Sequence, residues 1–188
     1  MPAYDSATTA LILIGLQQGI VTGDKGPRPG EEVVARAKDL AARFRTAGAP
    51  VVLVHVAFRE AGEMPSQRVS RPMLPAEGTP AAFYEFVEGL RQDGDIVVMK
   101  HHWGAFTGTD LDLQLRRRGV KTVVIAGIAT NFGVESTARS AWELSYDVVI
   151  PEDVTTSRSA DMHRFAIDTI LPAIAEVTTA EAIAFDAG

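Results

Sequence analysis

The feature that most constrains this chain is a strand-like segment that passes directly into a helix-like segment, between Lys121 and Arg139. Residues Val123 to Ala126 form an apolar run, typical of a strand buried in a parallel sheet. Apolar residues then recur at helical spacing, and we expect them to face that sheet: Phe132, Val134, Ala138, Ala141 and Trp142. A sharp strand-to-helix turn presents backbone N–H groups at the carboxyl edge of a sheet, where open α/β folds bind ligands.

The rest of the chain repeats this alternation of strand and helix patterns. The further expected strands are Thr9–Ile14, Val51–Ala57, Ile96–Met99, Asp147–Pro151 and Ala175–Val177. The expected helices are Glu31–Thr46, Pro80–Leu90, Asp110–Arg118, Phe132–Leu144, Ser159–Leu171 (N-capped by Ser157 or Ser159) and Thr179–Phe185. We expect loops at Thr22–Gly30 and at Phe58–Thr79, the second lying over the carboxyl edge of the sheet. The pattern predicts a three-layer α/β/α sandwich with a parallel sheet of about six strands, in one domain over residues 1–188.

The composition excludes several kinds of chemistry. The chain has no cysteine, so disulfides, cysteine-ligated metals and thiol nucleophiles are excluded. Its formal net charge of −6 argues against a surface that binds nucleic acid. The apolar run Ala10–Ile14 is too short to span a bilayer, and the N-terminus does not resemble a secretory signal. We therefore expect a cytoplasmic protein without a membrane partner.

Three predicted strand ends bring candidate site residues to one crevice, at residues 15–18, 100–106 and 128–133. Trp103 and Phe106 are candidates for a wall that binds a ring, although Phe106 is equally well explained as a core aromatic. His101 and His102 are adjacent, so they point in opposite directions in an extended chain and do not suggest a metal site. His55 lies inside an apolar strand and is expected to be a core residue.

The sequence resembles the isochorismatase-like (cysteine hydrolase) superfamily in three motifs: VVMKHHWGAFTGTDLDLQLRRRG, KTVVIAGIATNFGVESTAR and DVVIPEDVTTS. The resemblance covers nearly the whole chain and is closest to small, single-domain bacterial members. It implies the Rossmann-like fold of that superfamily. Its amidohydrolases use an Asp, a Lys and a Cys: the thiolate attacks a carbonyl, the carboxylate accepts the thiol proton, and the ammonium keeps the carboxylate charged.

Transferred position by position, the Lys of this triad is Lys100, whereas the Asp position is Gly15 and the Cys position is Gly133. Isochorismatases of the superfamily also have glycine at the nucleophile position, and they cleave a vinyl ether by protonation from the Asp. Gly15 removes that acid too.

No neighbouring residue obviously replaces the acid, although Asp24, Glu60 and Glu63 lie on loops that could return to the crevice.

The resemblance also implies where a small molecule binds. The superfamily has an oxyanion site at the turn after the central strand, often with a cis peptide at the position of Ile128–Ala129. The candidate substrate-binding residues are Gln17, Trp103, Phe106, Ile128, Ala129, Thr130 and Asn131. Metal-binding members carry Asp and His after the second strand, where this chain reads VHVAFREAGE, so we expect neither a metal nor another cofactor.

Three functional hypotheses remain open at this stage. The first is a hydrolase of isochorismatase type that acts on a small carbonyl- or carboxylate-bearing molecule, without cysteine-dependent amidohydrolase activity. The second is a catalytically inactive pseudoenzyme that serves as a binding or assembly protein. The third is an engineered inactive form of a hydrolase, with Gly15 as the introduced residue. Because related proteins form dimers or larger rings, we also expect a homo-oligomer.

Overall fold

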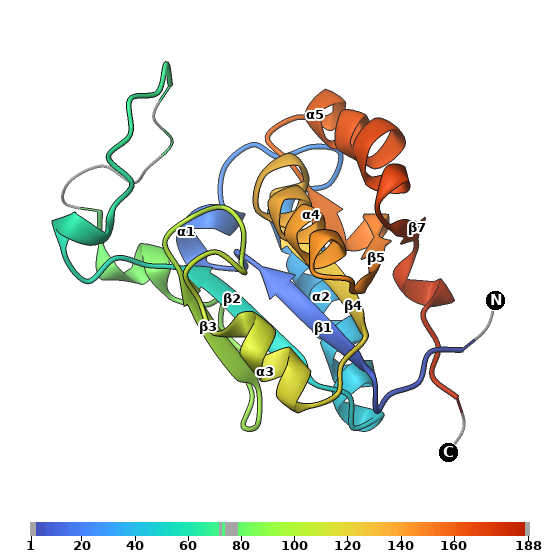
Figure 1. Ribbon diagram of the computed structural model, residues 1–188. Coiled ribbons are helices and arrows are strands. Elements are labelled where there is room, and N and C mark those ends of the chain that lie inside the picture. The colour runs from blue at the N-terminus through green and yellow to red at the C-terminus, as the bar shows by residue number, and fades with distance from the viewer. Residues whose placement is uncertain (1–2, 72, 74–78, 187–188) are drawn as a thin grey trace.

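A central parallel sheet of seven strands organises the computed structural model, which describes residues 3–71, 73 and 79–186 (Figure 1). The strands are β1 (Thr9–Ile14), β2 (Val51–Val56), β3 (Ile96–Lys100), β4 (Thr122–Ile128), β5 (Asp147–Pro151), β6 (Thr155–Thr156) and β7 (Glu176–Thr178). Their order is β3-β2-β1-β4-β5-β7, with β6 paired to β4. The predicted sandwich is confirmed. The additional strand, β6, spans two residues and is too short to produce a sequence pattern.

The strand order reverses direction at β1. The chain moves outward from β1 through β2 to β3, then returns to pair β4 with the other edge of β1. Ile14 is therefore in register with Val54 on one side and with Gly127 on the other. In an open α/β sheet, such a switch in strand order leaves a crevice beyond the carboxyl ends of the two strands, where ligands bind.

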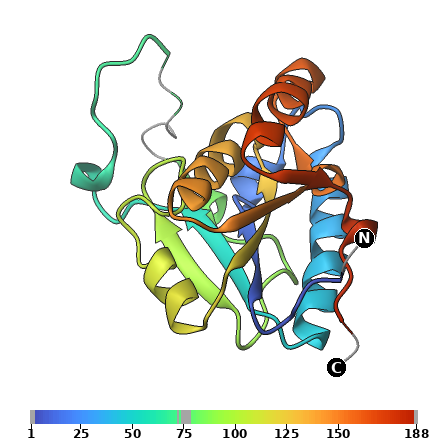
Figure 2. The same ribbon diagram turned by 45° about the vertical axis from the view of Figure 1, so that its right-hand side comes forward.

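Helices cover both faces of the sheet, as Figures 1 and 2 show. Their bounds are α1 (Gln18–Val21), α2 (Gly30–Thr46), α3 (Leu111–Arg117), α4 (Glu135–Glu143) and α5 (Ala160–Phe165). A hydrophobic core lies on each face of the sheet, and alternate residues of β1 contribute to each: Leu11 and Leu13 pack with α2, whereas Ile12 and Ile14 pack with α3 and α4. This is the two-residue period of a strand that is buried on both faces.

Two predicted helices are wrong in extent. Within Pro80–Leu90, only Ala81–Tyr84 forms a helix, and it is a short 3₁₀ helix. The next residues are extended because their backbone bonds to the loop after β1: Val87 N donates to Leu16 O, at 3.1 Å. Within Thr179–Phe185, the structure has only a 3₁₀ turn at Ala180–Ala182.

The helix after β4 begins earlier than predicted, with a π-helical turn at Thr130–Val134 that continues into α4. Trp142 does not face the sheet as expected, because it is 54% exposed. The predicted helix Ser159–Leu171 is divided into α5, a π-helical segment and a 3₁₀ turn. Its expected cap is confirmed, since the Ser159 hydroxyl accepts a hydrogen bond from Met162 N.

The long loop that begins at Phe58 contains one 3₁₀ turn, Ala61–Glu63, within its described part. Both ribbon views show this part projecting away from the body, so the expectation that it covers the carboxyl edge of the sheet is wrong there. Residues 72 and 74–78 of the predicted loop lie outside the described residues. None of the helices in the described part of the chain is long and apolar enough to cross a membrane.

The core on the α2 side provides a stability test. Phe44 is fully buried on α2, and its ring meets that of Phe185 edge-on, with centroids 4.8 Å apart. Replacing Phe44 by alanine removes this packing, so we expect the free energy of unfolding to fall by about 3–5 kcal/mol in urea denaturation. Leu113→Ala on α3, where the side chain is 48% exposed, is the matched control and should change it by less than about 0.5 kcal/mol. Similar losses in the two variants would contradict this assignment of the core.

Candidate functional site

The candidate site lies at the switch in strand order, where the chain leaves β1 at Gly15 and β4 at Ile128. Gly15 N donates to Val54 O at 2.9 Å, which holds the end of β1 against β2. The peptide bond between Ile128 and Ala129 is cis, as the family resemblance implied. The predicted turn therefore lies beside Gly15.

The backbone at Gly15 is fitted to glycine. Its φ is +64°, and a Cβ added there would lie 2.5 Å from Ile128 O. Real Cβ atoms do not approach a carbonyl oxygen so closely, and L-residues other than glycine rarely adopt this φ. In this conformation, position 15 has no room for the carboxylate that the family resemblance led us to consider there.

Gly133 faces Lys100. A Cβ added at Gly133 would lie 3.9 Å from Lys100 Nζ and 3.4 Å from Trp103 O. A side chain at this position would therefore point at the ammonium group. Part of this space is filled by Ile14, whose Cγ2 would lie 2.8 Å from the added Cβ.

Lys100 ends β3 with its side chain turned inward, and the residue is only 6% exposed. Its Nζ donates to His102 O at 2.7 Å and to Trp103 O at 2.8 Å. Burial lowers the Lys100 pKa to about 8, and no carboxylate in the described part of the chain contributes to that shift. An ammonium group has three N–H donors, so one of them remains for another acceptor.

The turn after β4 presents backbone donors. The N–H groups of Phe132 and Val134 both bond to Ala129 O, at 3.1 and 3.2 Å. Those of Thr130 and Asn131, the first two residues of the turn, have no protein acceptor among the described residues, as is usual at the start of a helix. The side chains of Thr130 and Asn131 instead bond to His163 and to Ser157.

Two predicted substrate-binding residues are engaged within the protein. Gln17 is fully buried: its amide nitrogen donates to Val56 O and Tyr84 O, and its amide oxygen accepts from Val56 N. Both amide hydrogens are used, so Gln17 links the end of β2 to the 3₁₀ helix Ala81–Tyr84 and has no donor left for a ligand. Phe106 packs on the core beside Tyr146, with centroids 5.9 Å apart, which is the core position that the sequence also allowed.

Trp103 is 51% exposed, and its ring meets Phe132 edge-on at 4.8 Å. Arg158 lies over the other ring of this pair, with Cζ 5.9 Å from the Phe132 centroid. Sequence analysis did not single out Phe132 or Arg158 as site residues. The available signal was positional, since Phe132 directly precedes Gly133 and Arg158 follows the strand ends at the same edge of the sheet.

None of the three candidate acids reaches Lys100. Asp24 and Glu60 are exposed. Glu63 accepts from Arg59 N at 2.6 Å, and its other oxygen lies 4.0 Å from His101 Nε2. His101 is itself turned toward the loop after β2, because its Nδ1 lies 2.7 Å from Ala57 O. Across the described residues, no group of three or more His, Asp or Glu side chains gathers where it could hold a metal ion.

The lack of room for a side chain at Gly15 can be tested by comparison with a glycine of similar backbone conformation. Gly119 has φ +70° and no atom within 4 Å of an added Cβ, so Gly119→Ala measures the cost of the φ angle alone. We expect that variant to lose about 1–2 kcal/mol of unfolding free energy. Gly15→Ala adds the overlap with Ile128 O and should lose roughly 2–4 kcal/mol in urea denaturation. Equal losses would show that position 15 has room for a side chain.

The burial of Lys100 predicts a pH dependence of stability. Its pKa is about 8 in the folded protein, against 10.5 in its unperturbed state, so the unfolded chain binds more protons between these values. Stability contributed by this group therefore rises with pH from 8 to 10.5, by up to roughly 3 kcal/mol. In urea denaturation, the free energy of unfolding of Lys100→Met should not show this rise between pH 7 and pH 10. The control Lys121→Met, which replaces an exposed lysine, should show it. A rise that persists in Lys100→Met would refute the assignment.

Comparison with known proteins places this geometry in a family. The family model described as the Isochorismatase domain matches residues 9–182. The chain is 48% identical to the isochorismatase family protein YecD of Escherichia coli O157:H7 over 185 residues, covering 97% of this chain and 98% of that protein. It is 33% identical to the ureidoacrylate amidohydrolase RutB of Methylobacterium radiotolerans over 193 residues, covering 89% and 75%.

Among solved structures, an isochorismatase family protein from Burkholderia thailandensis superposes with a TM-score of 0.91 at 42% identity. The match covers 97% of this chain and 96% of the other. The family model, the relatives and the fold all agree, and we conclude that the chain belongs to the isochorismatase family of hydrolase-like proteins.

Proposed function

We propose that this protein binds a small carboxylate- or carbonyl-bearing molecule between Lys100 and the Thr130–Gly133 turn, without cysteine-dependent amide hydrolysis. The observation that carries the proposal is the third N–H donor of the buried Lys100 ammonium, which has no counter-charge among the residues that the structure describes. Two donors are held by the carbonyls of His102 and Trp103, which leaves one for a ligand oxygen.

The electrostatics favour an anionic or strongly polar ligand. Burying a charge without an opposite charge is costly, and a bound carboxylate would lower that cost at Lys100. The backbone N–H groups of Thr130 and Asn131 offer further donors to an oxygen. The half-exposed ring of Trp103, whose own carbonyl holds Lys100, provides an apolar surface for the rest of the molecule.

If the family resemblance assigns the positions correctly, this chain lacks two of the three side chains that the superfamily's amidohydrolases use. RutB carries the name of an amidohydrolase, but this chain has no thiol, and Gly15 leaves no room for the carboxylate. Residues of such a unit act together, so losing two should reduce amide hydrolysis by many orders of magnitude. We therefore infer a degenerate site, either natural or engineered at Gly15, that serves binding rather than hydrolysis.

A second candidate is hydrolysis of isochorismatase type, by protonation of a vinyl ether. Gly133 favours it, because isochorismatases also have glycine at that position. The acid would come from the pair formed by Glu63 and His101, because His101 directly follows Lys100 and its Nε2 lies 4.0 Å from Glu63 Oε1. This candidate needs a movement of His101 away from Ala57 O.

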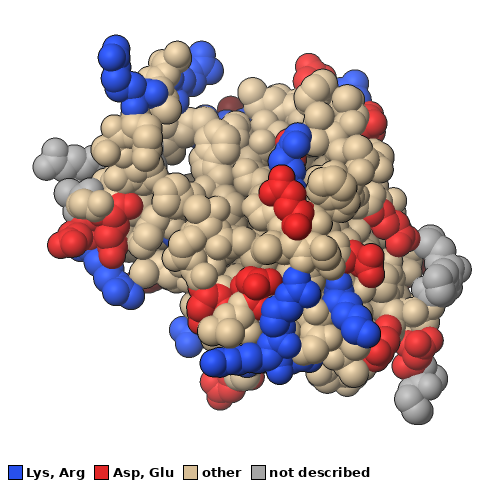
Figure 3. All heavy atoms as spheres, viewed as in Figure 1, with Lys and Arg blue, Asp and Glu red and all other residues tan. Residues whose placement is uncertain are grey.

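We extend the proposal to a single domain over residues 1–188 that is cytoplasmic and forms a homo-oligomer. Large apolar side chains are exposed on α4 and α5, which supports self-association: Trp142, Met162 and Phe165. On the face drawn in Figure 3, basic and acidic side chains lie close to one another around a broad uncharged area. This mixture of charges on one face and the net charge of −6 both support a protein that does not bind nucleic acid.

The test is a titration with acetate and with benzoate, followed by NMR of the backbone amides. We expect shifts centred on Thr130–Gly133 at pH 7 and a fall in affinity of about tenfold per pH unit above 8, as Lys100 loses its proton. Lys100→Met should abolish binding, whereas the control Lys121→Met should not. Binding that survives in Lys100→Met would overturn the proposed site.

The same samples test the absence of amide hydrolysis. Nicotinamide should not be turned over by the purified wild-type protein. Substantial turnover that disappears in Lys100→Met would show that the site is catalytic in spite of Gly15 and Gly133.

A further inference from the structure

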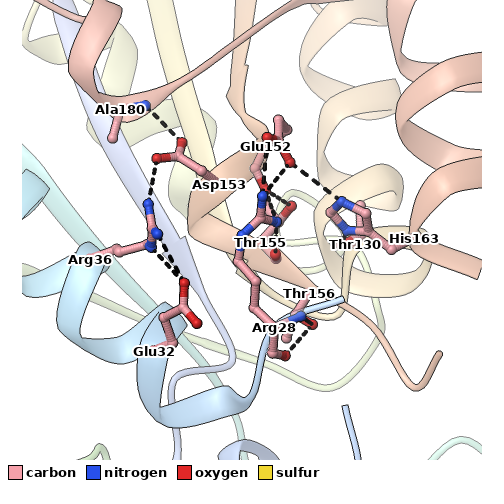
Figure 4. Close-up of polar contacts among 10 residues, drawn as sticks. All are labelled: Arg28, Glu32, Arg36, Thr130, Glu152, Asp153, Thr155, Thr156, His163 and Ala180. Carbon is pink, nitrogen blue, oxygen red and sulfur yellow. Dashed lines mark hydrogen bonds and ion pairs between the residues drawn. The ribbon is translucent and has the colours of Figure 1, made fainter. Parts of the chain in front are cut away.

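A series of polar contacts, buried at Thr130 and His163 and partly exposed at Glu152 and Arg28, connects the candidate turn to α5 and to the segment after β5 (Figure 4). His163 on α5 is 5% exposed, and its Nδ1 lies 2.8 Å from Thr130 Oγ1. Its Nε2 lies 3.6 Å from Glu152 Oε2. Arg28 Nη2 in turn donates to both oxygens of Glu152, at 3.1 and 2.9 Å. Of these four residues, sequence analysis singled out only Thr130, because a lone histidine on a helix has no spacing signature.

The neighbours of His163 select one tautomer of its neutral ring. The Glu152 carboxylate can only accept, so the nitrogen that faces it, Nε2, carries the hydrogen. Nδ1 is then the acceptor, and the Thr130 hydroxyl is the donor. The hydrogen of Thr130 is thereby directed at α5 and away from the crevice.

Burial is the main reason why the ring of His163 is neutral at neutral pH. Burial lowers the His163 pKa below its usual value of 6.5, and the positive charge of Arg28 acts in the same direction. Glu152 and Asp168 oppose this shift. Among the described residues, these three are the charged groups that act on the ring: Arg28 from the loop before α2, Glu152 from the 3₁₀ turn after β5, and Asp168 from the π-helical segment after α5.

We propose that His163 is a positioning residue. In its neutral form it accepts a hydrogen bond from the Thr130 hydroxyl, and this bond holds the backbone N–H groups of Thr130 and Asn131 in place for a ligand. The role in ligand binding rests on the proposed function, whereas the coupling between His163 and the turn does not. A second contact supports the coupling: the Ser157 hydroxyl bonds to Asn131 Oδ1, so residues 157–163 hold the first two residues of the turn.

Protonation of His163 reverses the hydrogen bond at the turn. In the imidazolium form both ring nitrogens are donors, so Nδ1 can no longer accept from Thr130. The hydroxyl must then rotate to become the acceptor, and its hydrogen loses its partner. The backbone at Thr130 and Asn131 should therefore report the protonation state of a ring on a different helix.

The experiment is a pH titration of isotope-labelled protein from pH 8 to pH 5, with NMR signals of the imidazoles and of the backbone amides. In the wild type we expect the neutral ring of His163 to carry its hydrogen on Nε2. The amides of Asn131 and Gly133 should titrate with the midpoint of His163. His55, a half-buried histidine on β2, is the control, and His55→Gln should leave that titration unchanged.

The variant Thr130→Val separates positioning from a direct effect of the ring charge. It removes the hydroxyl but leaves His163 able to titrate, so the amide titration should collapse while the imidazole titration remains. Thr130→Ser retains a hydroxyl, so in that variant the backbone amides should titrate as they do in the wild type. A full amide titration in Thr130→Val, or a neutral ring protonated on Nδ1, would overturn the proposal.

Acetate binding provides the link to function. Thr130→Val should weaken it roughly fivefold to tenfold, the effect of losing about one hydrogen bond, and Thr130→Ser should stay within about twofold of the wild type. If acetate does not bind the wild type, the proposed function fails, but the amide titration still decides whether His163 positions the turn. Equal weakening in both Thr130 variants would overturn the role of the hydroxyl.

Discussion

The close backbone contact between the ends of β1 and β4 is the constraint on which the rest of the site depends. A Cβ added at Gly127 would lie 2.1 Å from Ile14 O, and one added at Gly15 would lie 2.5 Å from Ile128 O. Two glycines in the left-handed region thus allow the two strands to end in direct contact. The turn that follows β4 is within reach of the Lys100 side chain from the end of β3, since Lys100 Nζ lies 3.9 Å from a Cβ added at Gly133.

The buried lysine follows from the same geometry. With no side chain at Gly15 or Gly133, the space around Lys100 Nζ holds no counter-charge from those positions, and two backbone carbonyls are its partners. Carbonyl dipoles offset only part of the cost of burying a charge, as the lowered pKa of Lys100 shows. The described part of this site has a buried cation and, at Gly15 and Gly133, neither a carboxylate nor a nucleophile, which is the basis for proposing that it binds an anion.

Part of the site could be predicted from the sequence, because parallel strands must end at a common edge. That rule placed Lys100 near Gly133, and the structure agrees, with 3.9 Å between Nζ and an added Cβ. The same reasoning did not reveal that the Gln17 amide bonds to Val56 and Tyr84, or that Trp142 is exposed on α4. Residue spacing indicates which edge or face a residue occupies, but its hydrogen-bond partners come from segments that are distant in sequence.

The sequence by itself determined the layers of the fold, the absence of a thiol and the presence of glycine at positions 15 and 133, since these follow from apolar periodicity and residue identity. Only the tertiary structure decided that Gly15 has no room for a side chain and that His163 reaches Thr130 from a helix 33 residues away. The physical reason is that periodicity encodes burial, which is a local property. Close approach and hydrogen bonding depend on how separate strands and helices pack together.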